Sequence, residues 1–250
     1  MNLKIISNYS LNFNFKKRNS KQIKFLIFHY TGMKNENQAI NKLTNAKSSV
    51  SSHYFIKRNG DILVLVPDLY TAWHAGKSYW KKLKNLNKNS IGIEISNPGH
   101  QNNYMKFSKN QIKSIFKLSK FLITKYKIKP KNILGHSDIA PSRKKDPGEK
   151  FPWKSFAKKK IGIWYSLSEK VLNKNRLKMI DHQSKKNFFR NLSKIGYSNY
   201  KTTNKKKENF NFLLIKAFQR RFRQKLINGI IDKECYLISE NIAKNSVKIS

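Results

Sequence analysis

Acidic residues and cysteine are scarce in this 250-residue chain. It has 13 Asp and Glu against 53 Lys and Arg, a formal net charge of +40, and a single cysteine, Cys235. One cysteine excludes an internal disulfide and a cysteine-based metal cluster. No run of about eighteen apolar residues occurs, so no membrane-spanning helix is predicted. The N-terminus lacks the apolar segment and small-residue cleavage site of a secretory signal, so we expect a cytoplasmic protein, with the periplasm or cell envelope as the alternative.

The excess of basic residues predicts attraction to polyanions, for which nucleic acid and an acidic cell-envelope polymer are both candidates. The lysines are scattered over the whole length, however, and no familiar nucleic-acid-binding motif is present. We therefore favour a solvated, lysine-rich surface and expect no specific nucleic-acid partner. Hydrophobic residues make up 38% of the chain, enough for a packed core, and we expect a monomer.

Short apolar runs and turn signals indicate an α/β fold. Residues 25–28 (FLIF) are typical of a strand buried on both faces. Asn59-Gly60 lies between two β-rich runs and predicts a hairpin with a type I′ turn, in which both central residues have positive φ. Ser108 and Gln111 form a capping box at the start of an amphipathic helix that ends before Pro130. Residues 1–22 are polar and basic and predict an irregular arm.

A loop rich in proline and glycine, residues 135–153 (GHSDIAPSRKKDPGEKFPW), contains His136 and Asp146 ten residues apart. Pro141 and Pro147 exclude a continuous helix between them, so the two side chains can meet only if the loop folds back. Imidazole and carboxylate are two of the three protein ligands that a catalytic zinc site usually has. The alternative is a surface loop with a turn at Asp-Pro-Gly.

Two further polar residues occur in apolar strands. His29 directly follows the 25–28 run, where α/β folds often place functional groups, although a structural histidine at a strand end is the alternative. Glu94 lies in an alternating segment in which Ile91, Ile93 and Ile95 share one face. A carboxylate there is costly to bury unless something charged or hydrogen-bonding meets it. Glu94 is therefore either a functional base or part of the exposed face of an edge strand.

The 135–153 loop, the His-Tyr-Thr at 29–31 and the SIGIE at 90–94 together resemble the N-acetylmuramoyl-L-alanine amidases of the type-2 amidase family. The resemblance implies a mixed central β-sheet flanked by helices and a zinc ion held by His29, His136 and Asp146. It also implies that Glu94 is the catalytic base. Lys144, two residues before Asp146, is predicted to stabilise the oxyanion that forms on the carbonyl, the alternative being a solvated lysine.

The segment Trp73-His74-Ala75-Gly76 is similar to the part of these amidases that lines the substrate groove, although an aromatic-rich loop can equally cover a core edge. We predict that Trp73, His74, Asn97 and Arg143 bind substrate, with Arg143 gripping a stem-peptide carboxylate. His53 is expected to orient or pack rather than to bind metal, because the three-ligand site is already filled. Ser142 stands where relatives often have glycine, which affects loop freedom but no ligand.

The composition changes after the predicted amidase domain, residues 1–165. Residues 166–180 are polar and basic and predict a linker, and residues 181–250 predict three short helices, the first ending at Gly196 and the third capped by Asp232. Residues 217–234 (AFQRRFRQKLINGIIDKE) are similar to a three-helix peptidoglycan-binding module found in some amidases. A generic helical tail is the alternative.

The resemblance implies a zinc-dependent amidase (EC 3.5.1.28). It would hydrolyse the bond between N-acetylmuramic acid, or its 1,6-anhydro form, and L-alanine of the stem peptide, in peptidoglycan turnover or recycling. The main rival is a non-catalytic peptidoglycan-binding protein, and a nucleic-acid binder is suggested by charge alone. Whether the substrate is polymeric peptidoglycan or a soluble muropeptide stays open, because the missing export signal favours the fragment and the C-terminal module favours the polymer.

Overall fold

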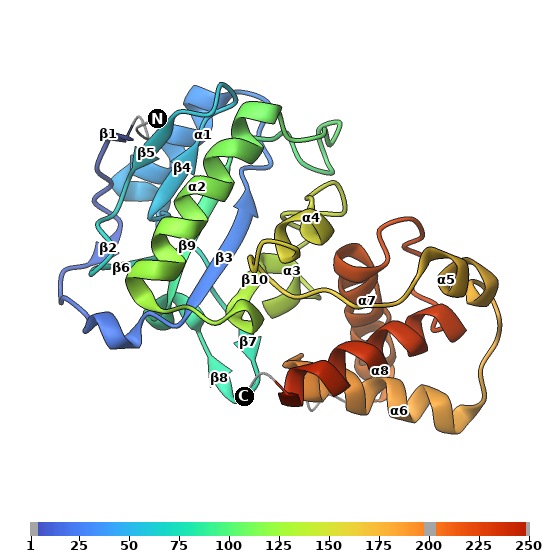
Figure 1. Cartoon of the computed structure of the whole chain (residues 1–250). Helices are drawn as coiled ribbons and strands as arrows, with labels where there is room; N and C mark the ends of the chain where they lie inside the picture. The colour runs from blue at the N-terminus through green and yellow to red at the C-terminus, as the bar shows by residue number, and fades with distance from the viewer. Residues whose placement is uncertain (1–4, 198–203, 249–250) are drawn as a thin grey trace.

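A six-stranded mixed sheet organises the first two thirds of the chain in the computed structural model, which describes residues 5–197 and 204–248 (Figure 1). The strand order is β1-β5-β4-β9-β3-β10, and only the β4–β5 pair is antiparallel. The strands are β1 (Ile5–Ser7), β3 (Phe25–Tyr30), β4 (Tyr54–Ile56), β5 (Ile62–Val64), β9 (Ser90–Ile95) and β10 (Ile133–Gly135). The mixed sheet flanked by helices that the sequence predicted is confirmed.

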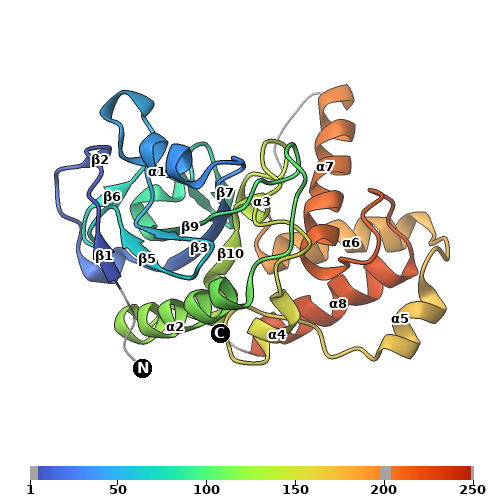
Figure 2. The same cartoon turned by 90° about the horizontal axis from the view of Figure 1, so that it is seen from above.

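Helices cover both faces of the sheet (Figure 2). The long helix α2 (Lys109–Tyr126) packs its buried residues on the isoleucines of β9, which share one face as predicted. Its N-cap is Ser108, with the predicted capping box to Gln111. The shorter helix α1 (Glu36–Thr44) packs against Phe55 and Leu63 on the other face. The second face of β9 is thus left for Gly92 and Glu94, beside the end of α1.

Short elements connect the sheet to its surroundings. The helices α3 (His136–Ile139) and α4 (Trp153–Ala157) follow β10. Two small antiparallel pairs are β2 (Phe13–Asn14) with β6 (Thr71–Ala72) and β7 (Tyr79–Trp80) with β8 (Leu83–Lys84). The 3-10 helices are η1 (Ser20–Gln22), η2 (Ala46–Ser48), η3 (Leu86–Asn89) and η4 (Pro130–Asn132).

Two predictions of local structure need correction. The β4–β5 hairpin is present, but its turn is not type I′, because Gly60 has a φ of 93° while Asn59 does not have positive φ. The Gly60 N–H donates to the Lys57 carbonyl at 2.9 Å, so the turn begins at Lys57, one residue earlier than predicted, and needs only glycine in the left-handed region. The N-terminal segment is also not wholly irregular, since β1 extends the sheet edge along β5.

Four helices form the C-terminal part: α5 (Glu169–Asn175), α6 (His182–Ile195), α7 (Asn204–Phe222) and α8 (Lys233–Lys248). Gly196 caps α6 and Asp232 accepts the Cys235 N–H at the start of α8, as predicted. α5 lies inside the predicted linker, and its Leu172 is buried. None of the described helices is long and apolar enough to cross a membrane.

The C-terminal helices share a hydrophobic core with the sheet. One continuous cluster joins Ile27 of β3 and Leu134 of β10 to Leu192 of α6, Phe218 of α7 and Ile238 of α8. Both views place these helices beyond β10, with α3 between the sheet and α7 (Figures 1 and 2). The helices therefore abut the segment that carries His136.

Candidate active site and metal centre

Parallel pairing of β3 and β10 brings His29 and His136 together. Leu134 and Gly135 lie beside Ile27 and Phe28, so His29 and His136 follow at the same end of neighbouring strands. The His29 Nδ1 is 2.9 Å from the His136 Nδ1, and the Asp146 Oδ2 is 3.1 Å from the first and 2.9 Å from the second. All three residues are buried, and their ligand atoms can surround one metal ion.

Asp146 reaches this cluster because the loop after α3 folds back. The Ser137 N–H donates to the Asp146 carbonyl at 2.8 Å, which ties the end of the loop to its beginning. Gly135 permits this closure, since a Cβ on it would lie 2.7 Å from the Pro147 Cδ. The predicted approach of Asp146 to His136 across the proline-containing loop is therefore observed.

Hydrogen bonds on the far side of the histidines fix which ring nitrogens carry protons. The Ser90 hydroxyl donates to the Leu86 carbonyl at 2.7 Å and is 3.2 Å from the His74 Nε2, so it accepts the proton of that nitrogen. The His74 Nδ1 is then an acceptor, and it receives the His29 Nε2–H at 3.0 Å. The Nδ1 lone pair of His29 is left pointing into the cluster.

His136 is oriented in the same way by a backbone carbonyl. Its Nε2 is 3.2 Å from the Ala75 carbonyl oxygen, which can only accept. The Arg143 Nη2 lies farther away, at 3.4 Å, and donates its two protons to the carbonyls of Ala75 and Lys77, so the His136 Nε2 carries the proton and Nδ1 a lone pair. Burial, followed by the neighbouring His136, lowers the pKa of His29 to about 4, so its imidazole is neutral at pH 7. Two lone pairs and a carboxylate oxygen within 3.1 Å of one another fit a cation, and two histidines with one aspartate are a donor set that zinc accepts.

Glu94 lies beside this cluster on an interior strand. β9 runs between β4 and β3, and its register places Glu94 next to His29, which excludes the edge-strand alternative. The buried Glu94 Oε2 has no hydrogen-bond partner in the described part of the chain. Burial, and next the charge of Asp146, raise the pKa of Glu94 to about 8. An unsatisfied carboxylate with a raised pKa is well suited to accept a proton near neutral pH.

A cavity of about 370 Å³ opens over the cluster. Its lining includes seven of the residues that the sequence analysis proposed for the site: Trp73, His74, Glu94, His136, Arg143, Lys144 and Asp146. The cavity also contacts residues that were missed, namely Tyr30, Thr31, Lys42, His100 and Lys145. The position of Tyr30 directly after His29 could have indicated that it lies at the site. Single lysines give no such indication in a chain so rich in lysine.

Arg143 and Lys144 occupy different surroundings in the cavity wall. The Arg143 Nη2 donates to the carbonyls of Ala75 and Lys77, at 3.0 Å each, and so ties the metal-binding loop to the loop after β6. Lys144 lines the cavity, and no hydrogen bond or ion pair engages its ammonium among the residues that the structure describes. The Lys144 ammonium is thus available to a ligand.

His74 lines the cavity, as a predicted pocket residue should, whereas Asn97 does not. Both ring nitrogens of His74 are used by His29 and Ser90, so His74 supports a metal ligand although part of its ring lines the cavity. Asn97 is 1% exposed and outside the cavity lining; its amide donates to the Met105 carbonyl and accepts the Gly99 N–H. Asn97 therefore holds the 97–105 turn and is corrected to a structural residue.

His53 packs in the core, as expected. It is fully buried, and its Nδ1 accepts the Gly92 N–H at 3.0 Å, which anchors β9 beside the cluster.

Comparison with sequence families matches residues 19–149 to the family described as N-acetylmuramoyl-L-alanine amidase. N-acetylmuramoyl-L-alanine amidase AmiD of Escherichia coli (strain K12) is 35% identical over 234 residues, covering 88% of this chain and 82% of AmiD. The 1,6-anhydro-N-acetylmuramyl-L-alanine amidase AmpD of the same strain is 38% identical over 107 residues, which are 43% of this chain and 56% of AmpD.

Solved structures show the same likeness over both parts of the chain. AmiD from E. coli in complex with the substrate anhydro-N-acetylmuramic acid-L-Ala-D-gamma-Glu-L-Lys aligns with a TM-score of 0.79 and 34% identity, covering 90% of each chain. AMPDH3 from Pseudomonas aeruginosa in complex with anhydromuramic pentapeptide aligns with a TM-score of 0.78 and 29% identity, covering 94% of this chain and 96% of that one. Coverage of this extent includes the C-terminal helices as well as the sheet.

Proposed function

The chain belongs to the N-acetylmuramoyl-L-alanine amidase family, and we propose from this premise that it is a zinc-dependent amidase (EC 3.5.1.28) acting on muramyl peptides. It hydrolyses the amide between N-acetylmuramic acid, or its 1,6-anhydro form, and L-alanine of the stem peptide. The observation that carries this proposal is the convergence of His29, His136 and Asp146 beside the unsatisfied carboxylate of Glu94. A non-catalytic, wall-binding protein would not need all four of these residues.

His29, His136 and Asp146 would hold the zinc through Nδ1, Nδ1 and Oδ2, the atoms that face one another. When bound, zinc supplies a Lewis acid for the carbonyl oxygen and lowers the pKa of a water toward about 7. His74 and the Ala75 carbonyl keep the two imidazoles in the required tautomer through their hydrogen bonds to the outer ring nitrogens.

Glu94 and Lys144 would carry the proton transfer and the charge stabilisation. The Glu94 Oε2 accepts a proton from the water that attacks the carbonyl carbon, and it returns that proton to the departing nitrogen of L-alanine as the C–N bond breaks. The Lys144 ammonium, without a partner in the cavity wall, stabilises the negative charge on the carbonyl oxygen. Trp73 and Arg143 are the proposed substrate contacts at the cavity edge.

The substrate form is proposed from the relatives. The AmiD and AMPDH3 structures are complexes with anhydromuramyl peptides, which supports a muropeptide as the substrate of this chain also. Polymeric peptidoglycan remains the second form to test, and the cytoplasmic location stays a prediction that cell fractionation would check.

The proposal is tested by separating metal binding from turnover. Purified protein should hold close to one zinc per chain, and His29→Ala should lose it. Glu94→Gln should keep the zinc and lower turnover of an anhydromuramyl tripeptide by about 100-fold or more. Full activity of Glu94→Gln would refute the base assignment, and a metal-free wild-type protein with full activity would refute the zinc mechanism. Binding of DNA that falls steeply with salt, without muropeptide hydrolysis, would instead favour the polyanion reading.

A further inference from the structure

The C-terminal helices contact the metal-binding loop through the carboxylate of Asp138. Asp138 is 2% exposed and lies two residues after His136, in the same short helix α3. One of its donors is local, the Gly135 N–H at 2.7 Å. The other two come from the C-terminal part: the Tyr197 hydroxyl donates at 2.6 Å, and the Arg221 guanidinium forms an ion pair with Oδ2. A carboxylate within the metal-binding segment is therefore satisfied mainly from outside that segment.

Arg221 contacts the chain on both sides of His136. Its Nη1 pairs with Asp138 and its Nη2 donates to the carbonyl of Ile133, the first residue of β10, at 2.9 Å. Its guanidinium lies over the Trp153 ring, 4.3 Å from the centroid, and the residue is 2% exposed. The planar fork of arginine can hold both acceptors at once, which the single ammonium of lysine cannot do in the same geometry. The two ends of the segment that presents His136 are thus held by one side chain.

An ordinary role for this pair would be to fasten the helices to the sheet. Buried charges of this kind are costly unless paired, so the pair certainly contributes to docking. The position of Arg221 indicates a second role, because its two acceptors, Asp138 and the Ile133 carbonyl, flank His136. The His136 Nδ1 must stay near 3 Å from two other ligand atoms. A shift of α3 would move that atom directly.

We propose that Arg221 and Tyr197 are positioning residues of the metal centre, holding β10 and α3 so that His136 stays in register with His29 and Asp146. The C-terminal helices then form part of the support of the active site, in addition to any wall-binding role. This inference rests on the metal site proposed above and not on the hydrolytic reaction, so it can be tested without substrate.

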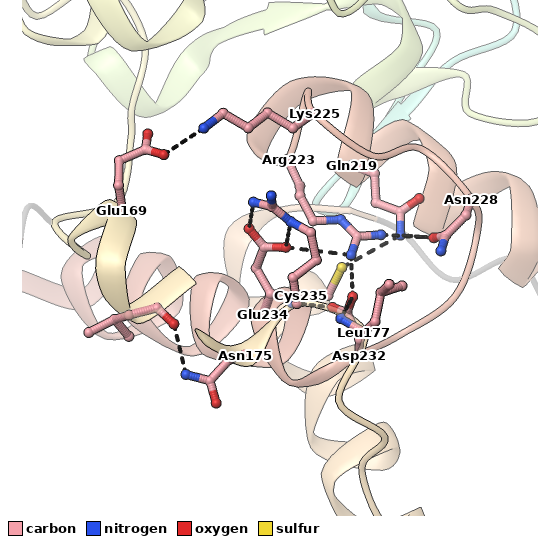
Figure 3. Close-up of polar contacts among 12 residues, drawn as sticks. Glu169, Asn175, Leu177, Gln219, Arg223, Lys225, Asn228, Asp232, Glu234 and Cys235 are labelled. Carbon is pink, nitrogen blue, oxygen red and sulfur yellow. Dashed lines mark hydrogen bonds and ion pairs between the residues drawn. The ribbon is translucent and has the colours of Figure 1, made fainter. Parts of the chain in front are cut away.

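The chain offers a matched control in Arg223, two residues beyond Arg221. Arg223 is also 2% exposed, but its partners all lie in the C-terminal part: an ion pair with Asp232, a second contact with Glu234 at 3.7 Å and a hydrogen bond to Asn228 at 2.8 Å (Figure 3). Arg221 and Arg223 therefore share burial and chemistry and differ in whether they touch the metal-binding segment.

The experiment compares Arg221→Lys, Arg223→Lys and Tyr197→Phe in the full chain. Zinc affinity is measured by competition with a chromogenic chelator, and the absorption spectrum of the cobalt-substituted protein reports ligand geometry. We expect Arg221→Lys to weaken zinc binding by about tenfold, the lower end of the effects seen for supporting hydrogen bonds at metal sites, and to alter the cobalt spectrum. Tyr197→Phe should weaken binding in the same direction, and Arg223→Lys should lower the melting temperature while zinc affinity stays that of wild type.

Wild-type zinc affinity in folded Arg221→Lys would overturn the proposal, as would an equal loss of affinity in Arg223→Lys. If Arg221→Lys does not fold, Tyr197→Phe decides, because it removes one hydroxyl and keeps the ring; wild-type affinity and cobalt spectrum in that variant would overturn the proposal. His29→Ala distinguishes a different failure: if that variant keeps its zinc, the metal site itself is wrongly assigned.

Discussion

Substitution of Gly92 by alanine should weaken metal binding although Gly92 is not itself one of the proposed ligands. A Cβ on Gly92 would lie 2.4 Å from the His74 Cγ, whereas ordinary contacts begin near 3.4 Å, so the imidazole ring must move by about 1 Å. The bonds from His74 to His29 and Ser90 are 3.0 and 3.2 Å long, and a shift of this size takes at least one of them beyond hydrogen-bonding distance. Loss of such a supporting bond typically reduces metal affinity by roughly 10- to 100-fold.

The assay is zinc affinity by chelator competition for four proteins: wild type, Gly92→Ala, His74→Ala and the double variant. If Gly92→Ala acts only by displacing the His74 ring, the double variant should bind zinc as tightly as His74→Ala alone, because the ring that clashes is gone. Two results would refute the reasoning. One is wild-type affinity in Gly92→Ala, and the other is a double variant weaker than His74→Ala by the full factor that Gly92→Ala shows by itself.

Two pH-dependent predictions follow from buried groups. Glu94 must be ionised to accept a proton, and its pKa is raised to about 8 in the metal-free protein. The positive charge of bound zinc should bring this pKa below 8, so kcat/KM should fall as the pH drops through an apparent pKa between the ordinary 4.5 and 8. An acid limb at 4.5 or lower would contradict this. Burial, and next Arg18, lower the pKa of His53 to about 3, so the unfolded state takes up the proton first and stability should decline as pH falls from 6.5 toward 3. In metal-free His53→Gln, the free energy of unfolding measured by chemical denaturation should decline less steeply with falling pH than in wild type, by up to about 1.4 kcal/mol per pH unit. An unchanged slope would count against a buried neutral His53.

The convergence of His29, His136 and Asp146 could be predicted because each has a local sequence signal. His29 follows an apolar strand, and His136 and Asp146 lie in a proline-punctuated loop whose motif resembles a known family. What the sequence could not show was the strand order, and with it the neighbours of Glu94. The choice between an exposed edge and an interior strand was settled only by β4 and β3 pairing on either side of β9.

The sequence did not reveal which local groups engage the polar side chains around the site. Asn97 was predicted to bind substrate, yet its amide is used by the Met105 carbonyl and the Gly99 N–H. His74 lines the cavity as predicted, but the sequence did not show that its two nitrogens form part of a chain from His29 to Ser90. Spacing along the sequence does not reveal such partners, because each depends on the path of an intervening loop.

The shortage of acidic residues gives each of them unusual weight in this chain. Among 13 Asp and Glu, five are buried, namely Asp68, Asp138, Asp146, Asp232 and Glu234, whereas no lysine is buried among the residues whose side chains the structure describes. A lysine on this surface is therefore uninformative, but a carboxylate in an apolar setting requires a specific partner. Asp146 meets two histidines, and Asp138 meets Arg221, 83 residues along the chain. Asp138 lies in the same motif as the proposed ligand His136, and its partner Arg221 links the C-terminal helices to the proposed metal site.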